Sequence, residues 1–88
     1  MVRGRKRASQ VAREAKPYRT AVRSFGLRVR FLRQKRNLTL EVAAERMDLD
    51  WKHLQKIEAG GINATFVTLV RLAKGLQVSL ADLFVDVE

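Results

Sequence analysis

A chain of 88 residues is long enough for one small domain and too short for the layered core and deep cleft that most enzymes need. It contains no cysteine, which excludes disulfide bonds and thiolate metal sites and suits a reducing compartment such as the cytoplasm. Its formal net charge of +9 predicts an anionic partner, and the lack of a long apolar run argues against a signal peptide or a membrane span.

The positive charge lies almost entirely in the N-terminal part of the chain. Residues 1–36 contain thirteen Lys or Arg and one acid, whereas residues 37–88 contain five Lys or Arg and eight acids. Residues 1–17 offer little apolar surface to bury, and we interpret them as a mobile basic arm. A short helix over about 9–16 is compatible with their composition, and Pro17 is expected to end it. A basic tail that only keeps the protein soluble is the simpler alternative.

The rest of the chain, residues 18–88, begins with the pattern of two helices. Phe25, Val29 and Leu32 recur at the spacing of one helical face and predict a first helix. Asn37 follows this helix and tolerates a left-handed backbone conformation. Thr39 is then a candidate N-cap for a second helix that runs to about residue 47.

Three further helices are predicted after that point. Asp48 and Asp50 fit a tight turn, in which the first takes a positive φ and the second caps a helix over about 51–59. Ser79 and Asp82 resemble the capping box of a short fifth helix. The fourth helix is expected to start after the N-cap Thr65, with an apolar stripe of Phe66, Leu69, Leu72, Ala73 and Leu76. No strand alternation or internal repeat competes, so the predicted fold class is all-α.

Two helices joined by a short turn, over about 39–59, match the unit that places its second helix in the major groove. Small side chains in the second helix allow a close crossing with the third; the facing positions are Ala43, Ala44, Met47, Leu54 and Ile57.

The stretch LTLEVAAERMDLDWKHLQKIEAG, residues 38–60, resembles the helix-turn-helix family that includes the phage repressors, Cro and bacterial regulators of the xenobiotic-response type. The resemblance continues through Leu72-Ala73-Lys74 to Leu83 and covers about residues 24–84. It implies a compact five-helix, lambda-repressor-like DNA-binding domain and leaves the basic arm unexplained.

The resemblance also implies which side chains read DNA bases, namely Trp51, Lys52, Gln55 and Lys56 at the exposed start and middle of the third helix. Lysine can donate to guanine O6 and N7, and glutamine suits adenine or a phosphate. Trp51 fits a thymine methyl group or a sugar, or it covers part of the core instead. Asp50 either caps the helix only or also accepts from a cytosine amino group.

A second group of residues is expected to contact DNA phosphates. Arg33 and Glu58 match family positions that form a charge pair between the first and third helices, and spare donors of Arg33 suit a phosphate. The other candidates are Thr39, His53, Asn63, Arg28 and, in the arm, Arg3, Arg5, Lys6 and Arg7.

Three positions depart from the family pattern. Leu40 replaces a glutamine that commonly bonds a phosphate, and residues 60–64 lack the cations often found in that loop. Gln77 stands where a glycine usually follows the fourth helix, with Gly75 two residues earlier. These departures increase the demand on the cations of the first helix and the arm.

The last nine residues predict a homodimer, because one recognition helix covers too few base pairs to single out an operator in a genome. The expected dimer face comprises Leu80, Leu83, Phe84, Val85 and Val87. The alternative is that Leu83 and Phe84 close the monomer core.

The function predicted from these patterns is sequence-specific binding of double-stranded DNA at an inverted-repeat operator, by a small cytoplasmic transcriptional regulator. No catalytic set is visible, His53 being the only histidine, and no metal, cofactor, membrane or small-molecule effector is expected. The alternative function is a helix-turn-helix adaptor or antitoxin whose main partner is a protein. Recognition of single-stranded RNA is weakly supported, since Tyr18 is the only aromatic residue near the arm.

Overall fold

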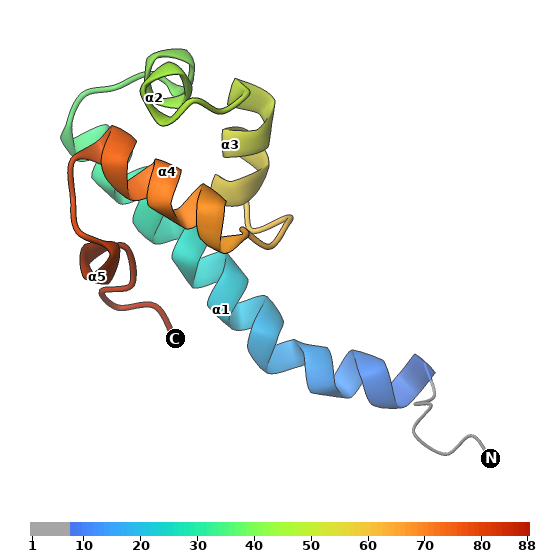
Figure 1. The fold of residues 1–88 in the computed structure, drawn as a ribbon. Helices are drawn as coiled ribbons and strands as arrows, with labels where there is room; N and C mark the ends of the chain where they lie inside the picture. Colours follow the sequence, from blue (N-terminus) through green and yellow to red (C-terminus); the bar gives the residue numbers. More distant parts are fainter. Residues whose placement is uncertain (1–7) are drawn as a thin grey trace.

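Five α-helices and no strand make up the part of the chain that the structure, a computed structural model, describes. That part comprises the backbone of residues 8–88 and the side chains of residues 18–88. The predicted all-α fold is therefore confirmed. Figure 1 shows α2, α3 and α4 gathered around one half of α1, while the other half of α1 extends beyond them.

The first helix, α1, spans Ala8–Lys35 and is much longer than predicted. The expectation that Pro17 ends a helix is wrong, because α1 continues through it. A proline inside a helix costs about 3 kcal/mol and removes one backbone hydrogen bond. The alanines and long polar residues on its N-terminal side have good helix propensity, which favours continuation. The ribbon of α1 changes direction in its N-terminal part, as a proline produces (Figure 1).

The second and third helices are α2, Leu40–Met47, and α3, Trp51–Glu58. Both start at the predicted caps. The Thr39 side chain accepts a hydrogen bond from the Val42 N–H at 3.1 Å, and the Asp50 carboxylate accepts one from the Lys52 N–H at 2.8 Å. Between them Asp48 has the predicted positive φ, 56°. The short turn and its two caps set the relative direction of the two helices.

The last two helices are α4, Phe66–Leu76, and α5, Leu80–Leu83. Gln77 closes α4 in a left-handed conformation with φ of 58°, so the missing glycine does not prevent a C-cap there. The capping box at the start of α5 is present: the Ser79 and Asp82 side chains each accept from the other's backbone N–H. The hydrogen bond that the Ser79 backbone N–H donates to the Asp82 carboxylate is the main cause that lowers the pKa of this carboxyl.

The core lies where α1 meets the other four helices. It includes the alanines and apolar residues predicted to lie between the second and third helices. Its buried hydrophobic members are Phe25, Val29, Leu32, Ala43, Ala44, Met47, Leu54, Ile57, Leu72, Ala73, Leu76 and Leu83.

Two glycines allow helices to approach in backbone contact. A Cβ at Gly26 of α1 would lie 2.4 Å from the carbonyl oxygen of Ile57, so α1 and α3 cross at this point. A Cβ at Gly75 of α4 would lie 2.9 Å from the backbone nitrogen of Met47 in α2, and closer still to its Cγ atom. Glycine at position 75 is therefore explained by packing and not by the end of α4.

Two residues lie elsewhere than expected. Phe66 does not join the apolar stripe of α4; it is 68% exposed. The buried face of α4 includes Thr68 and Leu72, and at 3.6 residues per turn position 66 lies about 120° from position 72. Leu83 is fully buried in the monomer, because the short helix α5 packs this side chain against the core. Leu83 therefore cannot form part of a dimer face.

Candidate nucleic-acid interface

One face of α3 is buried and the other is open to solvent. Leu54, Ile57 and Glu58 fix the helix to the bundle. The residues predicted to read bases all lie on the exposed face: Trp51, Lys52, Gln55 and Lys56. This surface therefore combines the amide of glutamine, which can both donate and accept hydrogen bonds, with two lysine ammonium groups and the ring of tryptophan. This surface has the chemistry that base edges in a major groove require.

The N-terminal turn of α3 is ordered by its cap. Asp50 uses its Oδ1 atom to accept from the Lys52 N–H, in agreement with the capping interpretation. Trp51 is 39% exposed and does not belong to the core cluster. The Lys52 ammonium lies 5.8 Å from the centroid of the Trp51 ring, within the range of a cation–π contact.

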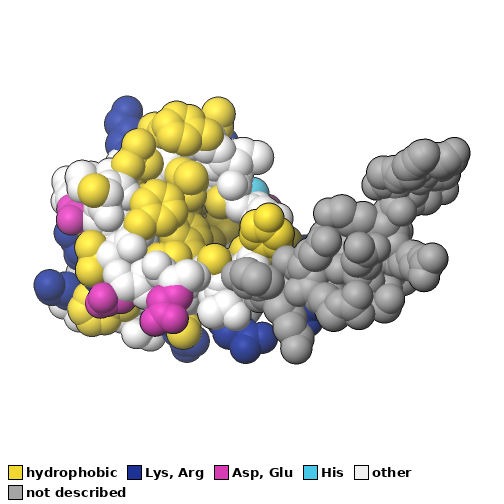
Figure 2. Space-filling model, turned by 90° about the horizontal axis from the view of Figure 1, so that it is seen from below, with side chains coloured by type: hydrophobic (Ala, Val, Ile, Leu, Met, Phe, Trp, Pro, Cys, Tyr) yellow, Lys and Arg dark blue, Asp and Glu magenta, His cyan; other side chains and the backbone are white. Residues whose placement is uncertain are grey.

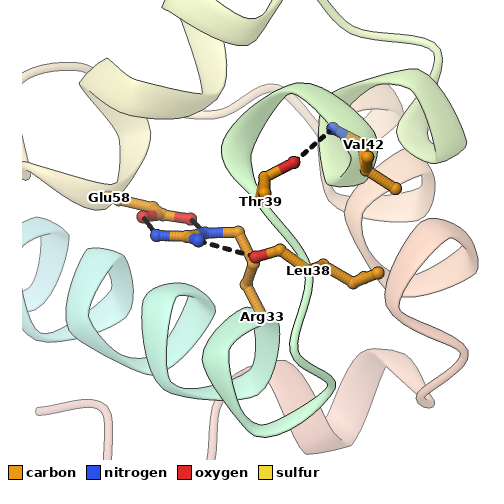
Figure 3. Close-up of polar contacts among 5 residues, drawn as sticks. All are labelled: Arg33, Leu38, Thr39, Val42 and Glu58. Carbon is orange, nitrogen blue, oxygen red and sulfur yellow. Dashed lines mark hydrogen bonds and ion pairs between the residues drawn. The ribbon is translucent and has the colours of Figure 1, made fainter.

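An ion pair ties α1 to α3 (Figure 3). Arg33 Nε lies 2.7 Å from Glu58 Oε2, and Arg33 Nη2 lies 3.0 Å from Oε1, so the contact is bidentate. Both side chains are largely buried, with 11% and 7% of their surface exposed. The hydrogen bond to Glu58 raises the pKa of Arg33, and burial opposes this.

The same guanidinium also reaches the start of α2. Arg33 Nη1 donates to the carbonyl oxygen of Leu38 at 2.8 Å, one residue before the N-cap Thr39 (Figure 3). Arg33 thus connects α1, the start of α2, and α3. Three of the five N–H groups of Arg33 have protein acceptors, which gives this side chain a structural role, and its phosphate role through the other two stays a prediction.

The remaining phosphate candidates differ in how accessible they are. Thr39 and Asn63 are exposed and His53 is half-buried. Arg28 points toward α5, where its Nε donates to the Asp82 carbonyl oxygen at 2.8 Å. Five residues along a helix turn a side chain by about 140°, so Arg28 points away from the face that carries Arg33. The arm residues Arg3, Arg5, Lys6 and Arg7 lie outside the described residues.

A family model described as helix-turn-helix matches residues 29–83, more than half of the chain. The chain belongs to this helix-turn-helix family. The matched range starts within α1 and includes α2, α3, α4 and α5. Members of this family are DNA-binding regulators, so the protein is a small sequence-specific DNA-binding transcriptional regulator.

Two proteins that are similar to this chain are named as control or controller proteins. The control protein C.MunI of Mycoplasma sp is 37% identical over 65 residues, which cover 73% of this chain and 88% of that protein. The crystal structure of the restriction-modification controller protein C.AhdI from Aeromonas hydrophila superposes with a TM-score of 0.69 at 33% identity. The superposition covers 73% of this chain and 96% of the C.AhdI chain.

Sequence reasoning missed one cation of this helix-turn-helix protein beside the recognition helix. Arg30 of α1 lines a cleft with Leu40, Gln55 and Ala59, next to the Arg33–Glu58 pair. The resemblance to the family predicts a phosphate-binding glutamine at the position of Leu40, and Arg30 places a guanidinium in the same cleft. The signal was the spacing of three between Arg30 and Arg33, which places both on one side of a helix.

Within the described residues, no helix is both long and apolar enough to span a membrane. The same part of the chain holds no cluster of histidine and carboxylate side chains that could bind a metal ion.

Proposed function

We propose that this protein is the controller of a restriction-modification operon and binds an inverted-repeat operator as a homodimer. The observation that carries the proposal is the exposed face of α3, where Lys52, Gln55 and Lys56 stand on a helix held by the Arg33–Glu58 pair. Similarity to C.MunI and to C.AhdI supports the choice of operon.

Within the interface, each side chain has a proposed task. Lys52 and Lys56 donate to guanine O6 and N7, Gln55 reads adenine or holds a phosphate, and Trp51 packs on a thymine methyl group or a sugar. Thr39 and Asn63 donate to phosphates on either side of the recognition helix. The rigid attachment of α3 matters because base contacts discriminate only when their geometry is fixed.

The proposed dimer face lies near the C-terminus. Leu80 is 36% exposed, and Phe84 and Val85 are each 44% exposed. Val87 is partly buried against the core and lies at the edge of this surface. Figure 2 shows hydrophobic side chains gathered over the bundle on the side seen from below. A contiguous apolar surface of this kind on a small domain commonly marks a protein interface.

Two residues of α1 that the sequence did not point to extend this surface. Leu27 is 56% exposed and Phe31 is 52% exposed, and both line one hollow with Val85. Phe31 is flanked by two cations, Arg28 and Lys35, whose charged groups lie 5.5 and 5.8 Å from its ring centroid. We include Leu27 and Phe31 in the proposed face.

Selection of bound sequences from a random pool of DNA duplexes tests the proposal. We expect one enriched sequence with two-fold symmetry, and we expect the same sequence upstream of the protein's own gene and its neighbouring restriction-modification genes. A gel shift with that upstream segment should survive an excess of competitor DNA. Failure to enrich any sequence would contradict the proposal.

A further inference from the structure

Five positions of α1 form one stripe that faces α3 and the loop after it. Arg19, Arg23, Gly26, Arg30 and Arg33 are separated alternately by four and three residues, the spacing of a single helical face. The neighbours of these positions follow the same order. Arg33 pairs with Glu58, and Gly26 abuts the Ile57 carbonyl, both on α3.

The stripe continues along the loop beyond α3. A Cβ at Gly60 would lie 2.9 Å from the Cα of Arg23, so α1 and the loop touch through their backbones. Arg19 lines a hollow together with Gly60, Gly61 and Asn63. The stripe therefore runs beside the recognition helix and then beside the loop that follows it.

Three of the four arginines in this stripe are free to bind a ligand. Arg19, Arg23 and Arg30 are exposed and have no carboxylate or other acceptor among the described residues. Arg33 differs, since Glu58 neutralises it. Arg19, Arg23 and Arg30 therefore form a line of three exposed positive charges that no described carboxylate neutralises.

The loop beside Arg19 presents donors without a cation of its own. The backbone N–H groups of Ile62, Asn63 and Ala64 donate no hydrogen bond within the described residues. Loop N–H groups and a nearby guanidinium are a common combination for phosphate binding. Arg19 supplies from α1 the charge that the loop sequence lacks.

We propose that Arg19, Arg23 and Arg30 form a ridge that binds successive phosphates of the DNA backbone flanking the bases read by α3. The inference rests on the DNA-binding function. The ridge is about 16 Å long at 1.5 Å per residue, and one DNA strand carries a charge every 3.4 Å of axis, so several phosphates fit along it. Two of its members, Arg19 and Arg23, precede the range that the family model matches.

The test compares two triple variants of the full chain. The first changes Arg19, Arg23 and Arg30 to Ala. The matched control changes Arg46, Arg71 and Lys74 to Ala, which removes the same charge from a groove between α2 and α4. The dissociation constant is measured against salt concentration on the selected operator and on a random duplex, and circular dichroism checks that both variants fold.

The ridge variant should flatten the log–log salt slope by about 2.7, at about 0.9 for each phosphate that an arginine no longer neutralises, equally on both duplexes. The control should change the slope much less. An unchanged slope in the ridge variant, or an equal flattening in the control, would overturn the ridge. A wild-type protein that does not prefer the operator would instead overturn the proposed function, while the slopes still decide on the ridge.

A second readout uses the absence of cysteine from the chain. In the variants Arg19→Cys and Arg71→Cys, an iron chelate that cuts nearby DNA is attached to the introduced cysteine. Cleavage of the operator's flanking backbone from position 19 and not from position 71 supports the ridge. No cleavage from position 19 contradicts it.

Discussion

Lys52 and Lys56 carry the main prediction at the scale of single residues, because both are exposed on the face of α3 that reads bases. Replacing either with Ala should cost about 1–3 kcal/mol of binding free energy on the operator and much less on random DNA. Lys74→Ala, which removes an exposed lysine from α4, is the control and should alter neither. Equal losses on the two DNAs would mean that the lysines contact only phosphate.

Glu58 carries a stability prediction. At a partly exposed site, loss of the pair would be expected to cost roughly 1–3 kcal/mol. Because both side chains are largely buried, we expect Glu58→Ala to lower the free energy of unfolding by about 3 kcal/mol or more, since it leaves the Arg33 charge buried without a carboxylate. Chemical denaturation measures this, with the exposed Glu45→Ala as the control. An unchanged midpoint would show that the pair contributes nothing.

At the scale of helices, the crossing of α1 and α3 depends on Gly26. A methyl group there meets the Ile57 carbonyl oxygen at 2.4 Å, and neither backbone can yield without tilting the recognition helix. Gly26→Ala should destabilise the fold by about 1–3 kcal/mol. In Gly61→Ala, by contrast, the new Cβ lies 3.5 Å from the nearest atom, an ordinary contact. Thermal unfolding of both variants makes the comparison, and equal midpoints would refute the importance of the crossing.

The segment before Pro17 has a separate role to test. Residues 1–16 contain six Lys or Arg and one acid, and deleting them should leave the fold intact while weakening DNA binding at low salt. If three of these cations neutralise phosphates, the log–log salt slope flattens by about 2.7. A full-length chain with the six cations changed to Gln should behave like the deletion. An unaltered slope would assign the segment to solubility or to a protein partner.

At the scale of the whole molecule, the proposed dimer should bring two recognition helices about 34 Å apart, one turn of DNA. Phe84→Asp and Val85→Asp should shift the protein from dimer to monomer in sedimentation, with weaker operator binding. Phe84 also stacks on Phe25 at 5.4 Å, so Val85→Asp guards against a simple folding defect. Phe66→Asp is the control, because Phe66 is an exposed residue of α4. A wild-type monomer that binds a single asymmetric site would disprove dimerisation.

Local patterns in the sequence determined the secondary structure after Asn37. The caps at Thr39, Asp50 and Thr65 and the capping box at Ser79 were predictable, because each depends on a side chain within three residues of the N–H that it accepts from. The exposed face of α3 followed from helical spacing together with a family resemblance.

Other features were decided only by the tertiary structure, because they depend on contacts between residues far apart in the chain. The continuation of α1 through Pro17 and the exposure of Phe66 could not be judged from propensity and periodicity alone. Composition showed that the first helix is basic, but not that Arg28 faces α5 while Arg30 faces α3. Which cations lie beside the recognition helix depends on the rotation of α1, and that is fixed by the close approach at Gly26 and the Arg33–Glu58 pair.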